Sequence, residues 1–183
     1  MAENRQSGQP GGSTPVPAAQ TVEPWLRGTL SELFPELRAV LHALQLARED
    51  VERWCGNLSE QQLHARPHGL PSVATQLRHI AGSLDRLLTY AEGGSLSENQ
   101  KKFLAAEADF SGGREALLAD FESALAAAEI RIRAIPRQTW AEPRSVGRKQ
   151  LPTTVAGLLI HCADHTQRHV GQAVTTAKIV MSK

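Results

Sequence analysis

The sequence predicts an all-α domain, an antiparallel four-helix bundle that follows a disordered N-terminal tail. Four segments of helical length carry large apolar residues at spacings of three and four, the period that gathers them on one face of an α-helix. No segment shows the alternation of apolar and polar residues that is typical of a half-buried strand. Because only one connection between these segments is long, we expect the helices to pack as a bundle.

The first 23 residues hold mainly small and polar types, with almost no large apolar side chains. Such a segment cannot bury enough apolar surface to offset the entropy that ordering would cost. We therefore expect residues 1–23 to be a disordered tail. Residues 24–183 then form one domain, which is long enough to bury a substantial core.

The first long helix is expected to begin at Pro35, because proline fits the first turn, where its missing N–H costs nothing. Gly56 ends it. A capping-box pattern from Ser59 to Gln62 then predicts a short helical turn. The apolar face of the first long helix comprises Leu37, Val40, Leu41, Leu44, Val51 and Trp54.

The second long helix is expected to begin after Ser72, a good N-cap, and to end at Gly93. A further capping signal at Ser97 predicts a shorter helix that runs to about Glu107. The apolar face of the second long helix comprises Val73, Leu77, Ile80, Leu84, Leu87, Leu88 and Ala91.

A third long helix spans residues 114–135 and stops before Pro136, which cannot continue it. The connection 137–152 is polar and is expected to include a short extended ribbon. Thr153 or Thr154 then caps the last helix. The apolar residues of these two helices are Leu117, Leu118, Phe121, Leu125, Ala128, Ile132 and Ile135, followed by Val155, Leu158, Leu159, Cys162, Val170, Ala173, Val174 and Ala177.

Three of the seven histidines interrupt the apolar stripe of the last helix, at positions 161, 165 and 169. Residues four apart lie on one face of a helix, one turn above the other. Two imidazoles at this spacing can hold one metal ion, as in the zinc proteases. A third ligand must come from elsewhere, and the best candidate is His79 in the second long helix.

The spacing leaves three interpretations open: a metal site on His165 and His169, one on His161 and His165, or a polar stripe in a helix interface. His161 and His169 differ by about 80° around the helix axis, so all three are not expected to meet one ion. Cys162 could ligate beside His165, although its apolar neighbours favour a core position. The remaining histidines, 42, 64 and 68, are expected to be structural or solvated, with a rim role open to the two in the loop.

The composition excludes several other classes of protein. A net charge of +1, scattered Lys and Arg, and few aromatic residues give no sign of nucleic-acid binding. No apolar run approaches the roughly 20 residues of a membrane span, and the N-terminus lacks a signal-peptide pattern. Two cysteines give no disulfide framework, which favours a cytoplasmic location.

The region from Pro24 to Lys178 resembles the DinB-like superfamily of metal-binding four-helix bundles, which is related to the YfiT-like hydrolases. Members carry one histidine in the second helix, and a His-x-x-x-His followed two residues on by Gly-Gln in the last. His79 fits the first position, and the run from His165 to Gln172, HTQRHVGQ, fits the second. The resemblance selects 165 and 169 as the metal-binding pair. Val170 departs from it, since many members have Arg there.

Three histidine ligands would leave at least one open position on the ion, whereas a closed structural zinc site normally has four protein ligands. Imidazole ligands suit Zn, Ni or Fe. Such an ion could activate water, polarise a carbonyl or hold a thiolate. Gln172, His161 and Asp164 are candidates to orient the ligand rings through their other nitrogens.

The resemblance implies a metal-dependent thiol S-transferase or hydrolase that acts on a small molecule, with a low-molecular-weight thiol as a candidate partner. No Ser-His-Asp order, carboxylate pair or phosphate loop points to another enzyme class. The alternative is a non-catalytic metal-binding or stress-associated interaction module. Because relatives often pair through bundle helices, a homodimer is also expected. No catalytic residue is assigned.

Overall fold

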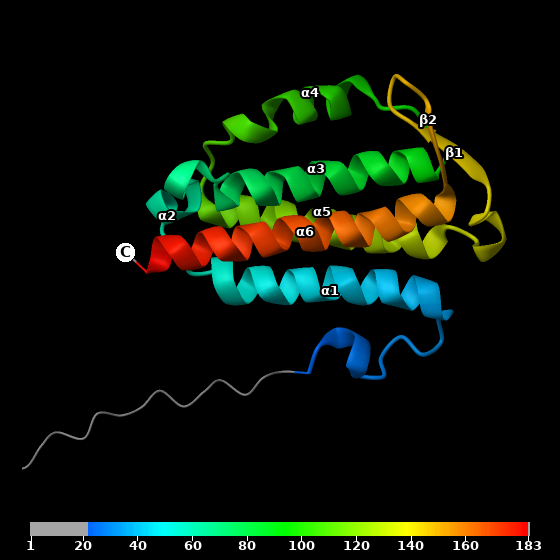
Figure 1. Cartoon of the computed structure of the whole chain (residues 1–183), viewed down its shortest axis with the longest axis horizontal. Coiled ribbons are helices and arrows are strands. Elements are labelled where there is room, and N and C mark those ends of the chain that lie inside the picture. Colours follow the sequence, from blue (N-terminus) through cyan, green and yellow to red (C-terminus); the bar gives the residue numbers. More distant parts are fainter. Residues whose placement is uncertain (1–21, 183) are drawn as a thin grey trace, which may run out of the picture.

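Four long helices pack side by side in the structure, a computed structural model that describes residues 22–182. Helix α6 lies between α1 and α3, and α5 packs against α1 and α3 on the other side (Figure 1). The predicted all-α bundle is confirmed. Of the predicted tail, residues 1–21 lie outside the described residues. The four helices are α1 (Pro35–Cys55), α3 (Val73–Ala91), α5 (Arg114–Ala134) and α6 (Val155–Met181).

The directions of the four helices refine the predicted antiparallel arrangement. Figure 1 shows α1 and α6 running one way, and α3 and α5 the other way. Helices α3 and α5 can be parallel neighbours because α4 (Glu98–Ala106), which lies between them in the sequence, carries the chain back to the other end of the bundle. The turn η3 (Glu107–Asp109) follows α4 and packs against α3. This return brings the buried Glu107 of η3 against α3.

The connections and caps agree with the sequence pattern. Ser59, Ser72, Ser97 and Thr154 each accept a hydrogen bond from the backbone N–H three residues on. The predicted ribbon is a two-stranded antiparallel hairpin that starts with Pro143 opposite Thr154. The minor elements are η1 (Pro24–Leu26), α2 (Glu60–His64), η2 (Pro67–Gly69), η4 (Arg137–Thr139), β1 (Pro143–Val146) and β2 (Leu151–Thr154).

The apolar faces predicted for the four helices form one core, and nearly all of their residues are buried. The exceptions are half-buried at its edge: Trp54, Leu87, Leu118 and Val174. At the end that carries the hairpin, Trp140 meets Phe34 edge to face, with ring centroids 4.9 Å apart. Within the described part of the chain, none of the helices is long and apolar enough to cross a lipid bilayer.

Two adjacent residues of α6 test this burial pattern. Leu159 is fully buried, whereas the side chain of Ile160 is 56% exposed. We expect Leu159→Ala to lower the free energy of unfolding by about 3 kcal/mol, because it leaves a cavity in the core. Ile160→Ala should change it by less than about 0.5 kcal/mol. Urea unfolding of both variants measures the difference, and equal losses would contradict the orientation of α6.

Candidate metal centre

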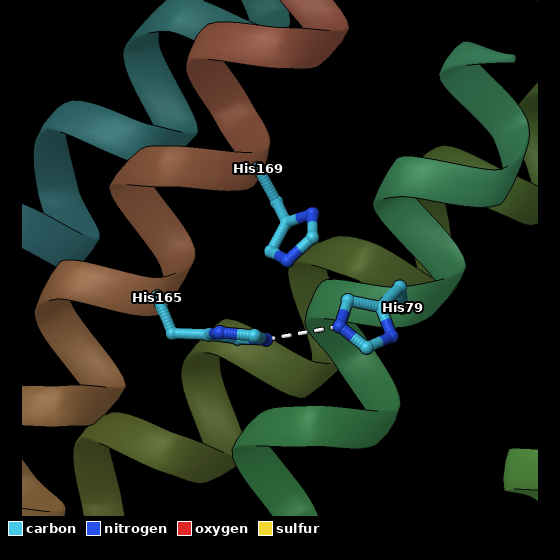
Figure 2. A group of neighbouring side chains, drawn as sticks. All are labelled: His79, His165 and His169. Carbon is cyan, nitrogen blue, oxygen red and sulfur yellow. Dashed lines mark hydrogen bonds between the residues drawn. The ribbon is translucent and has the colours of Figure 1, made fainter. Parts of the chain in front are cut away.

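Three histidines from two helices meet in the groove between α3 and α6. His79 lies in the middle of α3, and His165 and His169 lie one turn apart in the middle of α6. Figure 2 shows the three rings pointing toward one another across the groove. One ring nitrogen from each lies within 4.8 Å of the corresponding nitrogens of the other two. We call these residues the histidine cluster.

The spacing of the rings suits a single small cation. The Nε2 atoms of His79 and His165 are 2.9 Å apart. The ring of His169 lies with its centroid 4.4 Å from each of the other two. Three nitrogens bound to zinc at 2.0–2.1 Å would be about 3.3 Å apart. Small side-chain movements would therefore bring all three nitrogens to one ion.

A buried ion pair fixes the orientation of His79. Glu107 of η3 is only 6% exposed, and its Oε2 lies 2.8 Å from Nδ1 of His79. Its other oxygen accepts a hydrogen bond from Nη1 of Arg86, which is also buried. Because a carboxylate accepts, we place the proton of His79 on Nδ1. The lone pair of Nε2 then faces the histidine cluster.

The ion pair also keeps the carboxylate charged. Burial by itself would raise the pKa of Glu107, but the hydrogen bonds from His79 and Arg86 outweigh it and lower that pKa below its ordinary value. Glu107 is therefore ionised at neutral pH. An ionised acceptor behind a histidine strengthens that ring as a metal ligand.

A glycine in α3 makes room for this carboxylate. A Cβ atom at Gly82 would collide with the Glu107 carboxylate, the Phe103 ring and the Arg86 guanidinium. Glycine inside a helix costs up to about 1 kcal/mol relative to alanine. Helix α3 thus has its destabilising glycine at the position where the Glu107 carboxylate packs against it.

An amide pair orients the second ring. Nδ1 of His169 donates to Oε1 of Gln76 over 2.6 Å, and Nε2 of Gln76 donates to Oε1 of Gln172 over 2.9 Å. Gln76 is only 3% exposed. The proton of His169 is therefore on Nδ1, which leaves its Nε2 free as a ligand. The buried Nδ1 of His165 has no hydrogen-bond partner among the described residues.

The sequence comparisons agree with this arrangement. The family model of the DinB superfamily matches residues 43–173, which include all three members of the histidine cluster. The chain belongs to the DinB superfamily. The resemblance predicted from the spacing of the histidines is thus confirmed.

Solved structures support the fold of this DinB-superfamily chain. A conserved protein from Enterococcus faecalis superposes with a TM-score of 0.64 over 79% of this chain and 96% of its own. Because the two sequences are only 19% identical, the likeness concerns the fold alone. No curated protein matches the sequence.

Burial favours the neutral form of His165 and His169. It lowers the pKa of His165 to about 4, and the nearby charges of His169 and His79 act in the same direction. Burial also lowers the pKa of His169. Neutral imidazole is the form that binds metal ions. At neutral pH these two rings need no deprotonation before an ion binds.

Of the other residues predicted to support the site, His161 lies beside His165, with ring centroids 5.1 Å apart. His161 is half-exposed, and its Nδ1 lies 3.5 Å from Oδ2 of Asp164. Asp164 pairs with Arg168 over 2.9 Å and does not contact the histidine cluster. Gln172 hydrogen-bonds to Gln76, which in turn accepts a hydrogen bond from His169. The metal-binding and orienting roles assigned from the sequence stay predictions, although the geometry brings His79, His165 and His169 together.

The remaining candidates lie apart from the histidine cluster. Cys162 is fully buried in the core, where burial raises the pKa of its thiol to about 12, which disfavours a thiolate ligand. His42 is buried against Thr29. His64, expected in a loop, is the last residue of α2 and hydrogen-bonds to a backbone carbonyl, and His68 is exposed.

Three residues of the site were not predicted. Gln76 and Arg86 are polar residues on the buried side of α3, at positions three before and seven after His79. Because they interrupt an apolar stripe, these two residues could have been predicted to belong to the site. Glu107 offered none, because its position depends on how the chain returns through α4.

The lowered pKa of His165 predicts acid sensitivity of the metal-free protein. Between its folded value of about 4 and the ordinary 6.5, the unfolded chain binds more protons, so stability falls as the pH drops through this range. From pH 7 to pH 5 this difference in proton binding would lower the free energy of unfolding by about 2 kcal/mol. We expect a loss of about 1 kcal/mol, because the ring is partly solvated. Urea unfolding with a chelator measures the loss.

Two variants assign that loss. His165→Gln should make the stability less dependent on pH over this range, because the titrating ring is gone. His68→Asn, in an exposed loop, should behave like the wild type. An unchanged pH dependence in His165→Gln would show that the cluster histidine is not responsible.

Proposed function

We propose that this DinB-superfamily chain is a metal-dependent enzyme that transfers a low-molecular-weight thiol to a small electrophile, or hydrolyses such a molecule. The single observation that supports the proposal is the convergence of three imidazole nitrogens within 4.8 Å, from two different helices. A structural role alone would not explain why large apolar residues are missing from the centre of the α6 stripe.

The residues present fit a divalent transition metal. An all-imidazole donor set suits Zn, Ni or Fe. His79 and His169 hold their protons on the nitrogens that face Glu107 and Gln76, so their other nitrogens are free for ligation. When bound, the metal would supply a Lewis acid that activates a thiol or water and polarises the electrophile.

The chain itself contributes orientation and an open approach. Arg86 holds Glu107, and Glu107 fixes the ring of His79. All three histidines are only half-buried, so a small molecule can reach them from solvent. Three protein ligands leave at least one coordination position for a non-protein ligand. This combination favours chemistry over a closed structural site.

One observation favours the alternative, a non-catalytic metal-binding module. Among the described residues, Glu107 is the carboxylate that hydrogen-bonds to the histidine cluster, and both of its oxygens are already engaged. No free carboxylate is thus placed as a general base. A screen of metal-loaded protein with cysteine and other small thiols against 1-chloro-2,4-dinitrobenzene separates the two functions. The expected homodimer and cytoplasmic location stay predictions.

Metal content is the primary test. We expect about one Zn, Ni or Fe per chain in tag-free protein, measured by inductively coupled plasma mass spectrometry. Alanine at His79, His165 or His169 should reduce it at least tenfold, since each removes one ligand. His161→Ala is the matched control and should keep its metal. Metal-free wild type, even after incubation with divalent ions, would exclude the proposed function.

The role of Glu107 gives a separate expectation. Glu107→Gln keeps the size of the side chain but removes its charge, so the affinity for zinc should fall about 10- to 100-fold. Glu98→Gln, at an exposed carboxylate of α4, is the control. Competition with a chromogenic zinc chelator measures both affinities. Equal affinities would mean that Glu107 only supports the fold.

A further inference from the structure

A pocket of about 330 Å³ opens in the α3–α6 groove next to the histidine cluster. Gln76, which hydrogen-bonds to His169, lines it, and so does Gln172, one turn beyond His169 on α6. Leu70 and Pro71 form its wall on the α3 side. The pocket therefore begins within one residue of the candidate metal centre.

The hydroxyl groups around this pocket are already used inside the protein. Thr175 Oγ1 donates to the carbonyl of Gly171 over 2.8 Å, and Thr176 Oγ1 lies 3.3 Å from the carbonyl of Pro71. Neither hydroxyl proton is therefore free to bond to a ligand.

The oxygens of both amides in the lining also accept hydrogen bonds, that of Gln76 from His169 and that of Gln172 from Gln76. Gln76 and Gln172 bond to each other over 2.9 Å. The one charged residue in the lining, Arg168, pairs with Asp164 over 2.9 Å. The side-chain polar atoms left for a ligand are Nε2 of Gln172 and the other nitrogens of Arg168, so the main attraction of the pocket is apolar surface.

We propose that this pocket binds the apolar portion of the small electrophile while its reacting centre lies at the histidine cluster. This inference rests on the proposed function and names the part of the substrate that the function leaves open. A volume of about 330 Å³ is at the low end for ligand pockets and suits a short alkyl chain or a single ring. The polar groups of a low-molecular-weight thiol would lose hydrogen bonds to water here.

Gly171 provides a way to close the pocket without disturbing the cluster. It lies on α6 and lines the pocket, and a Cβ atom built there meets nothing within 4 Å. Its φ is not among the positive values of the chain, so a larger residue fits the helical backbone. Gly171→Leu should fill the pocket. Ala127→Leu, on an exposed face of α5, adds a similar side chain elsewhere.

The test uses zinc-loaded protein and a series of straight-chain hydroxamic acids, from acetohydroxamic to octanohydroxamic acid. The hydroxamate group binds the zinc and directs its tail into the groove. Affinity, measured by isothermal titration calorimetry, should rise about threefold to fourfold per methylene until the pocket is full, and then stay constant. For a tail of equal length that ends in a carboxylate, the increase in affinity over acetohydroxamic acid should be at least tenfold smaller.

The variants decide the location of the tail. In Gly171→Leu the gain with chain length should disappear while acetohydroxamic acid binds as in the wild type; Ala127→Leu should keep the gain. No gain in the wild type, an unchanged gain in Gly171→Leu, or a preference for the carboxylate tail would overturn the proposed pocket and leave the metal centre intact. Failure to bind zinc, established beforehand by metal analysis, would overturn both proposals.

Discussion

The antiparallel packing of α3 against α6 is the constraint on which the site depends. It sets His79 opposite the His165–His169 pair, and neither helix alone supplies enough ligands for an ion. The return of the chain through α4 then brings Glu107 to the far side of His79, where Arg86 holds it. Residues from three distant parts of the sequence thus meet in one groove because of the order of the helices.

Periodicity was enough to predict the four helices, because it depends on residues within a turn or two of each other. It left the metal-binding pair open, and the resemblance to the family selected His165 and His169. The direction of α5 was not predictable from periodicity, since an amphipathic pattern reads the same in either direction. Glu107 was missed because its position depends on how the chain returns through α4. In sequence it is only an acidic residue at the end of a short helix. Gln76 could have been found, because a buried amide one turn from His79 breaks an otherwise apolar face.

The site is costly to the protein when no cation is bound. Three features act against stability: an interior glycine at position 82, neutral imidazoles held in partly buried positions, and a His165 Nδ1 with no partner among the described residues. Apolar residues at these positions of the α3–α6 interface would pack at lower cost. A metal ion that binds only the folded state would stabilise that state and so offset these unfavourable contributions. The local composition is therefore better explained by ligand binding than by the requirements of the bundle.

The groove differs in character on the two sides of the histidine cluster. One side holds the ionised Glu107 with Arg86, and the other continues into the pocket beside Gln76, whose polar groups are already paired. A ligand with a polar reacting end and an apolar tail has one favourable orientation here. The reverse orientation would place the polar end in the pocket, where it would lose hydrogen bonds to water without replacement. The character of the groove would thus orient the proposed substrate.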